Sequence, residues 1–167
     1  MRSDYVEPDT VQQILAKMKP QNALALRVTL ETGLRIGDVL KIKTSALERS
    51  RGFSVRQQKT GKRKHVKLSN SLRNALKTYS GAYYAFPGRL KHDSHRNRST
   101  VWRDLKRACN ALKINPEHVS PHSMRKIFAQ TVFERTNSLE DVQKELQHEK
   151  ISTSELYVRP RAPPDGV

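Results

Sequence analysis

Apolar residues recur at helical spacing over most of this chain. The first such stripe follows Pro8, a residue suited to the first turn of a helix, and stops before Pro20. Its apolar positions are Val11, Ile14, Leu15 and Met18. Residues 23–30 are then apolar nearly all round, which predicts a central buried helix closed by Gly33.

Between residues 52 and 68 the apolar period shortens to two. Phe53 and Val55 alternate with polar residues, residues 59–62 (Lys-Thr-Gly-Lys) are typical of a turn, and residues 65–68 resume an extended pattern. This segment predicts a β-hairpin with a basic tip.

Helical spacing returns after the hairpin. Residues 81–97 separate two of the helical segments and predict a loop, Asn115-Pro116 stops one helix, and Ser120-Pro121 starts the next. The four further stripes are Leu72, Ala75, Leu76 and Tyr79; Val101, Leu105, Ala108 and Leu112; Met124, Ile127, Phe128, Thr131 and Val132; and Leu139, Val142 and Leu146. The pattern predicts a mainly α fold with one small antiparallel β-sheet, an α+β domain.

A length of 167 residues suits one domain, and residues 160–167 show no periodicity, so we expect a short disordered tail there. The lone Cys109 rules out an intramolecular disulfide and fits a reducing cytosol. No apolar run approaches the roughly 20 residues that span a bilayer, and a signal-peptide core is missing. We therefore expect an intracellular protein that has no membrane partner.

The charge favours a polyanion as partner. The formal net charge is +16, the pI is about 10.3, and no Asp or Glu occurs from Arg49 to Lys91. A nucleic-acid face explains this bias better than a merely solvated surface does, although charge alone does not separate DNA from RNA. The residues that we expect to bind the nucleic acid are Arg56, Lys62, Arg63, Lys64, Arg96 and Arg98.

Candidate chemistry lies mostly in the last third of the chain. His122 and Arg125 are three residues apart on a predicted helix and so share a face, His148 follows, and Tyr157 comes nine residues later. Far upstream, Arg35 lies just past the end of the buried helix. Cations, imidazoles and one tyrosine, without a metal-ligand cluster, indicate attack on a phosphodiester by the tyrosine itself.

Each group suits one task of that reaction. Arg35 and Arg125 are the candidate clamp, because a guanidinium binds two phosphate oxygens and stays protonated. His122 is placed to assist proton transfer from the tyrosine, and His148 to donate a hydrogen bond to phosphate. Lys59, on the hairpin, is expected to protonate the leaving 5′ oxygen.

The joint order of these segments carries more information than any one of them. Thr-Gly-Leu-Arg at 32–35, Lys-Thr-Gly-Lys at 59–62, His-x-x-Arg at 122–125, Leu-x-His at 146–148 and then Tyr157 resemble the catalytic domain of the tyrosine recombinases, the phage-integrase family. The resemblance runs from about Pro8 to Tyr157. The catalytic positions that it implies are Arg35, Lys59, His122, Arg125, His148 and the nucleophile Tyr157, with Lys62 and Lys64 as alternatives for the lysine.

The resemblance also implies a reaction. Family members join the DNA 3′ phosphate to the tyrosine and free a 5′ hydroxyl that attacks a partner strand, which gives site-specific integration or excision without metal, ATP or cofactor. The implied partners are double-stranded DNA attachment sites, other copies in a homo-tetramer on paired sites, and accessory DNA-bending proteins. We expect a monomer in the free state, and a cytoplasmic, nucleoid-associated location in a bacterial or phage-infected cell.

The chain departs from the family pattern at three positions. Asp38 stands where many members have Glu, Met124 replaces a common Leu, and Gln147 replaces the usual Gly, which strains the turn before His148 if that position needs positive φ. The expected catalytic domain is residues 1–159. It starts almost at Met1, so we expect the N-terminal core-binding (clamp) domain to be absent from this chain, either a fragment or a minimal member.

Two other functions share some of these features. A type IB topoisomerase uses the same chemistry but religates the same strand, and an inactive integrase domain serves as a DNA-binding regulator. The motif contexts and the six filled positions favour the recombinase.

We further expect the serines and threonine at 152–154 to cap a small detachable helix, which leaves Tyr157 away from the arginines in the free domain.

Overall fold

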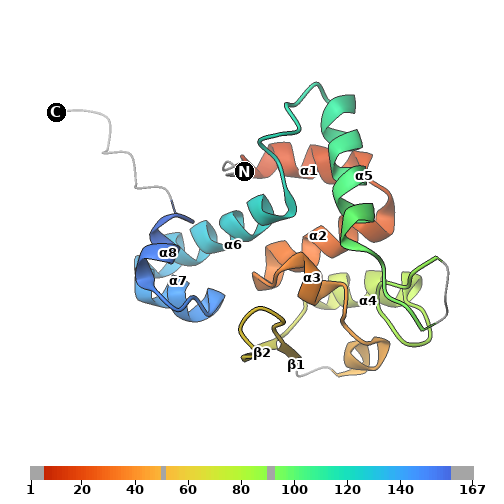
Figure 1. Cartoon of the computed structure of the whole chain (residues 1–167), viewed down its shortest axis with the longest axis horizontal. Coiled ribbons are helices and arrows are strands. Elements are labelled where there is room, and N and C mark those ends of the chain that lie inside the picture. Colours follow the sequence, from red (N-terminus) through yellow and green to blue (C-terminus); the bar gives the residue numbers. More distant parts are fainter. Residues whose placement is uncertain (1–5, 50–51, 90–92, 159–167) are drawn as a thin grey trace.

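The computed structural model describes residues 6–49, 52–89 and 93–158, so the tail expected at 160–167 lies outside the described residues (Figure 1). The elements in chain order are α1 (Pro8–Lys17), α2 (Pro20–Thr32), α3 (Ile36–Val39), the 3-10 helix η1 (Thr44–Glu48), β1 (Phe53–Arg56), β2 (Arg63–Val66), α4 (Asn70–Tyr79), α5 (Arg98–Ala111), α6 (Pro121–Thr136), α7 (Leu139–Leu146) and α8 (Ile151–Glu155). The predicted mainly α fold with a small antiparallel sheet is confirmed.

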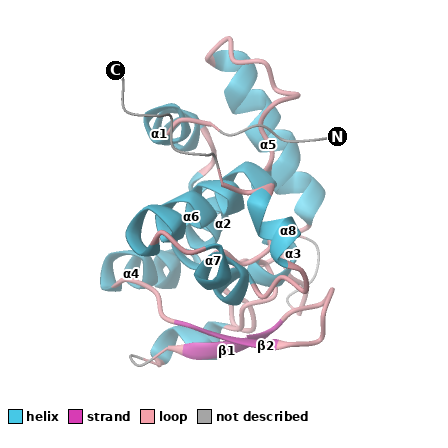
Figure 2. Cartoon of the chain, turned by 90° about the vertical axis from the view of Figure 1, so that its left-hand side faces the viewer, coloured by secondary structure: helices cyan, strands magenta, loops and turns pink. Residues whose placement is uncertain are grey.

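Helix α2 is the centre of the molecule, as its apolar sequence predicts. It packs against α6, α4, α3 and α5, while α7 packs on α6 and α8 on α7 (Figure 1). The hairpin lies below α2 and α7 in the turned view (Figure 2). Elements from the middle and from the last third of the chain therefore lie around α2.

Helix ends follow local sequence signals. Pro8, Pro20 and Pro121 each occupy the first turn of a helix, and Ser120 forms a capping box with Ser123. Gly33 ends α2 at φ 67°, where a Cβ would lie 2.5 Å from a ring carbon of Phe128. Glycine at this position therefore permits both the left-handed turn and the close approach of α6.

The hairpin is shorter than the sequence indicates. Its strands pair from Phe53 with Val66 to Arg56 with Arg63, and residues 57–62 form the connection. The expectation of an extended run over 65–68 is thus shifted by two residues, because pairing with β1 decides where β2 begins. The result places Lys59 at the tip of the connection.

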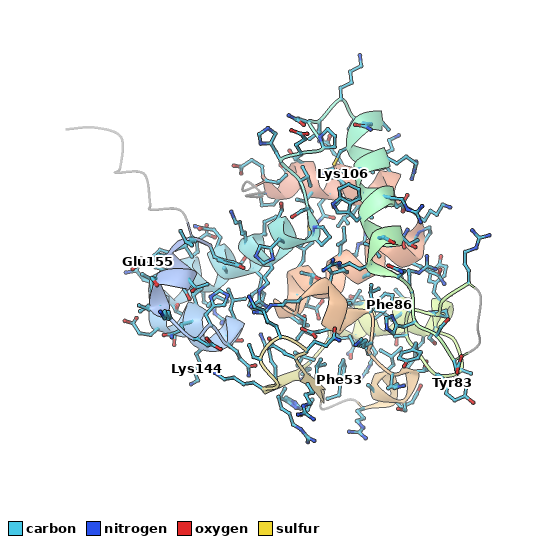
Figure 3. The ribbon with its side chains drawn as sticks, in the orientation of Figure 1. Phe53, Tyr83, Phe86, Lys106, Lys144 and Glu155 are labelled. Atoms are coloured by element: carbon cyan, nitrogen blue, oxygen red, sulfur yellow. The ribbon has the colours of Figure 1, made fainter. Side chains whose placement is uncertain are left out.

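Buried apolar residues form two clusters. The main core surrounds α2 and includes Phe53 and Phe86, while a smaller cluster lies between α6 and α7. The smaller one, here called the C-terminal cluster, consists of Ala129, Val132, Val142 and Leu146, with Tyr157 and Val158 packed against it. In Figure 3, Lys144 and Glu155 lie on the outer side of α7 and α8, away from α2.

One predicted core position is wrong. Thr131 of α6 is exposed and its hydroxyl donates to the carbonyl of Ile127, whereas Ala129 is buried. The reason is that Thr131 lines an open cleft together with Leu30 and Lys64, so no other element covers this side of α6. None of the helices in the described part of the chain has both the length and the apolar character that crossing a bilayer requires.

Candidate active site

Arg35 lies in the short link between the end of α2 and the start of α3. Its backbone is extended, and its half-buried side chain reaches the hairpin, where Nη1 donates to Oε1 of Gln57. The buried neighbours Leu34 and Ile36 hold this link against the core. The backbone of Arg35 is therefore held by the core, and its guanidinium is held by the hydrogen bond to the hairpin.

Arg125 is the largest side chain that is almost fully buried, at 1% exposed. It donates from Nη1 to the carbonyl of Gly33 and from Nη2 to the carbonyl of Leu146 at 2.8 Å. These carbonyls are at the ends of α2 and α7, where helices leave such groups without partners. Among the described residues, its Nε has no hydrogen-bond partner.

His148 follows a left-handed residue at the end of α7. Gln147 adopts φ 52° and ψ 43°, so the condition under which glutamine strains this turn, a positive φ, is met. The turn directs His148 inward, where it is 8% exposed. Because arginine only donates, Nε2 accepts from Arg125 Nη2 at 3.4 Å, and Nδ1 donates to the Ser154 hydroxyl at 3.1 Å.

Tyr157 lies inside this group rather than away from it. Its hydroxyl is hydrogen-bonded to Nε2 of His122, and its ring packs edge-on against His148 with centroids 4.7 Å apart. The expected separation of the tyrosine from the arginines is wrong for this structure. Helix α8 begins at Ile151, so the serines and threonine lie within it instead of capping it, and Ser154 is buried against His148.

A cleft of about 310 Å³ joins four of the predicted catalytic side chains. It is lined by Arg35, Lys59, His122 and Arg125, together with the exposed Arg98. A neighbouring cleft of about 510 Å³ shares part of this lining and adds other residues of the same face: Asn97, Ser99, Trp102 and Ser120. The predicted residues therefore converge, because Tyr157 is bonded to His122 at this cleft and His148 packs against Tyr157.

Burial and mutual repulsion set the charge states here. Burial lowers the pKa of His148 to about 4, and Arg125 and Arg35 add to the lowering. Loss of hydration, then Arg125 and other nearby cations, also lower the pKa of His122 to about 4. Burial lowers the pKa of Arg125 to about 10, with Arg35 contributing and Tyr157 opposing. At neutral pH the site thus holds charged arginines and neutral imidazoles, which suits an anionic ligand.

Two residues that sequence reasoning did not assign a role also contact the site. Asp38 accepts a hydrogen bond from the backbone N–H of Gln58 at 2.9 Å, which ties the hairpin connection to α3. Gln57 is fully buried between Arg35 and Gln147. A sequence signal for Gln57 exists, because it continues the alternation of Phe53 and Val55 on the inward face of β1.

The six predicted DNA-binding residues divide into different environments. Arg56, Lys62, Arg63 and Arg98 are exposed. Arg96 is half-buried and donates to Oδ1 of Asn22 at 3.1 Å and to Gln21. Their contacts with DNA stay predictions.

Lys64 differs from the expectation of a DNA-facing lysine. Its Nζ is 2.7 Å from the carbonyl of Thr32, donates also to the carbonyl of Glu145, and lies 3.5 Å from the Glu145 carboxylate. Burial lowers its pKa to about 8, with Glu145 opposing. The alternation in β2 turns this residue inward, so its ammonium joins α2 to α7 instead of facing solvent.

The fold is that of the tyrosine recombinase catalytic domains. A structure of a lambda integrase tetramer bound to a Holliday junction superposes with a TM-score of 0.74 at 20% identity, over 100% of this chain and 51% of that one. The sequence model described as the phage integrase family matches residues 4–162, and the chain belongs to this family.

Several curated relatives are tyrosine recombinases of the Xer type. XerA of Pyrococcus furiosus is 28% identical over 154 residues, which are 88% of this chain and 53% of the relative. XerC of Erythrobacter litoralis is 31% identical over 144 residues, 83% of this chain and 46% of the relative. The chain thus spans about half the length of these relatives. Neither the topoisomerase nor the inactive regulator gains support from them.

Proposed function

We propose that this chain carries the catalytic machinery of a site-specific tyrosine recombinase, which cleaves and rejoins DNA strands through a 3′-phosphotyrosine. The observation that supports this most strongly is the hydroxyl of Tyr157 hydrogen-bonded to His122 beside the buried Arg125. A DNA-binding module needs cations for phosphate but has no use for a tyrosine held at a base. The alternative of a regulator without catalytic function therefore leaves this contact unexplained.

The phosphate site is proposed to lie in the cleft between Arg35, Lys59, His122 and Arg125. The Nε of Arg125, which has no hydrogen-bond partner among the described residues, offers one donor, and the charge on Arg35 offers a second pole for the non-bridging oxygens. The N-terminus of the 16-residue α6 lies at the same cleft and adds its partial positive charge. These groups are fixed before DNA arrives, which is the arrangement that stabilises charge in a transition state.

The proposed cleavage step moves two protons. The Tyr157 oxygen attacks phosphorus while its proton passes to Nε2 of neutral His122, and the bond from phosphorus to O5′ breaks as Lys59 gives O5′ a proton. The products are a 3′-phosphotyrosine diester and a free 5′ hydroxyl. Attack by the 5′ hydroxyl of a second strand reverses the step and rejoins the DNA, so no external energy source enters.

His148 is proposed to have two roles in sequence. In the described arrangement its Nε2 accepts from Arg125, so it holds the guanidinium. Donation to a phosphate oxygen requires that nitrogen to carry a proton, which the ring gains by changing tautomer or charge when DNA binds.

The partner is proposed to be double-stranded DNA with paired sites held by several copies of the protein, as in the tetrameric lambda integrase complex. Cytoplasmic location, monomeric free protein and accessory DNA-bending proteins stay predictions.

The test is covalent trapping. A pool of nicked duplexes with randomised sequence around the nick is incubated with the protein and EDTA, so that loss of the short 5′-hydroxyl fragment prevents rejoining. We expect a detergent-resistant adduct whose peptide map places the DNA on Tyr157. Tyr157→Phe is the matched control and should bind the pool without forming an adduct. A parent protein that forms no adduct, or one on Tyr79, Tyr83 or Tyr84, would overturn the proposal.

A further inference from the structure

The side chain of Arg35 is the start of a chain of hydrogen bonds that joins three segments distant in the sequence. Its Nη1 donates to Oε1 of Gln57, and Gln57 Nε2 donates to Oε1 of Gln147 at 2.7 Å. Gln147 Nε2 then donates to the backbone carbonyl of Arg63 at 2.9 Å. Residues from the α2–α3 link, the hairpin and the end of α7 are thereby joined.

The chemistry of the groups fixes the direction of this chain. A guanidinium has only donors, so the Gln57 atom that meets Arg35 is its oxygen, and its nitrogen is left to donate to Gln147. The oxygen of Gln147 is then the acceptor, and its nitrogen faces the Arg63 carbonyl. Every donor thus points the same way, away from the cation, and such chains strengthen by mutual polarisation.

The burial of Gln57 favours this one set of hydrogen-bond partners over others. Gln57 is 0% exposed, and a buried amide is costly unless both its ends have partners. Arg35 and Gln147 supply those two partners. Any movement of Arg35 away from this position leaves the oxygen of Gln57 without a donor, so the relay opposes that movement.

Gln147 occupies a backbone conformation that glycine adopts freely. At φ 52° it has the left-handed geometry that disfavours side chains with a Cβ, and it stands where the family usually has Gly. A glycine here would relieve the strain but would have no side chain to reach Gln57. The presence of glutamine is explained if the hydrogen bonds of its amide stabilise the site by more than the left-handed backbone destabilises it.

We propose that Gln57 and Gln147 are positioning residues that hold Arg35 and the hairpin connection in register with the scissile phosphate. This inference rests on the proposed function, because it gives Arg35 a phosphate to bind. Lys59 is two residues after Gln57, and His148 directly follows Gln147, so the same relay sets the spacing of three proposed catalytic groups. Neither glutamine touches the reacting atoms.

The decisive variant is Gln147→Gly, because strain and relay predict opposite results. Loss of the relay should lower the rate of adduct formation at saturating DNA by about 10-fold, short of the roughly 100-fold cost of a ~1 Å misplacement. DNA affinity should stay within about twofold, and the melting temperature should not fall. A purely structural role for Gln147 predicts an unchanged rate, and that outcome would overturn the proposal.

Two further variants separate the side chain from the backbone. Gln147→Asn tolerates the left-handed turn but is one methylene too short to meet both Gln57 and Arg63, so it should match the glycine variant. Asn137→Gly is the control, since Asn137 ends α6 at φ 51° and lies outside the relay. It should cut at the parental rate. Equal losses in Asn137→Gly and Gln147→Gly would show that backbone change alone slows the reaction.

A double-mutant cycle tests the link between the two glutamines. If they act through one chain, Gln57→Leu combined with Gln147→Gly should be no slower than Gln57→Leu alone, whereas multiplied effects would overturn the relay. The side-chain amide protons of Gln57 in the free protein give a readout that needs no cleavage. They should exchange slowly in the parent and fast in Gln147→Asn. A parent that forms no adduct overturns the proposed function, while these protons still decide the relay.

Discussion

The two arginines and the tyrosine of the site rest on very different parts of the molecule. Arg35, in the link between α2 and α3, and Arg125, on α6, lie beside the main core, and Arg125 is bonded to two backbone carbonyls. Tyr157 follows the five-residue α8 and packs on a cluster of four buried residues. Small clusters open more easily than large cores. The phosphate-binding half thus rests on the larger core, while the nucleophile half has far less apolar burial.

The largest expected effect comes from removing the arginines. Arg35→Ala and Arg125→Ala should each slow adduct formation on the order of 100-fold or more, because a transition-state charge donor is lost. Their stabilities should differ, since Arg125→Ala leaves two carbonyls unpaired and costs about 3 kcal/mol, against about 1 kcal/mol for Arg35→Ala. Single-turnover cleavage and urea unfolding measure both quantities. Equal stabilities would remove the distinction between a buried scaffold arginine and a half-buried one.

Lys59 should behave differently from both arginines when the leaving group is changed. With a normal strand, Lys59→Ala should slow cleavage by about 100-fold, as expected for loss of a general acid. With a 3′-p-nitrophenyl phosphate at the cleavage position, whose leaving group needs no proton, the variant should approach the parental rate. Arg35→Ala should stay slow on both substrates. A Lys59 defect that persists with p-nitrophenol would show that Lys59 is not the general acid.

The nucleophile half should be the easier one to loosen. Val142→Ala opens a gap in the C-terminal cluster and should cost about 2 kcal/mol, with a several-fold fall in adduct rate because Tyr157 loses its support. Val11→Ala, which makes the same change in the main core far from the site, is the control. It should lower stability similarly without slowing the reaction. Equal rate losses in the two variants would contradict the separation of the halves.

Acid should weaken the contact between the halves. Because the pKa of His148 falls to about 4 on folding, the unfolded chain binds this proton more tightly, and stability is full above pH 6.5 and falls as the pH drops towards 4. The expected loss from this residue between pH 7 and 5 is about 2 kcal/mol. Unfolding at pH 7, 6 and 5 measures it, and His148→Gln should flatten the curve. An unchanged slope in that variant would show that His148 is not held neutral.

The smallest effect concerns the hairpin surface. Lys62→Ala with Arg63→Ala should flatten the slope of log affinity against log salt by about 2 units at most, one for each phosphate that is no longer neutralised. Adding Lys64→Met should change that slope no further, because the Lys64 ammonium faces Thr32 and Glu145. A third unit of slope from Lys64 would show that it turns outward on DNA.

Much of this molecule follows from local sequence. Apolar spacing places the helices, and Pro8 and Gly33 mark helix ends, because propensity and capping act within a few residues. The motif contexts identify the family and the six candidate catalytic positions. In the structure these side chains line one cleft or contact one another beside it. Whether they perform the proposed roles is left to the experiments above.

Only the tertiary structure decides which distant polar groups meet. Local spacing turns Lys64 and Gln57 inward, but it does not say that Lys64 meets Glu145 or that Gln57 meets Gln147, 90 residues away in sequence. The carbonyl partners of Arg125 are likewise 92 and 21 residues away. Periodicity reports the apolar face of one element, whereas a buried hydrogen bond depends on how two elements pack. The sequence by itself thus determined the elements and the candidate chemistry, and packing determined which groups are held, which are free to bind phosphate, and where the tyrosine lies.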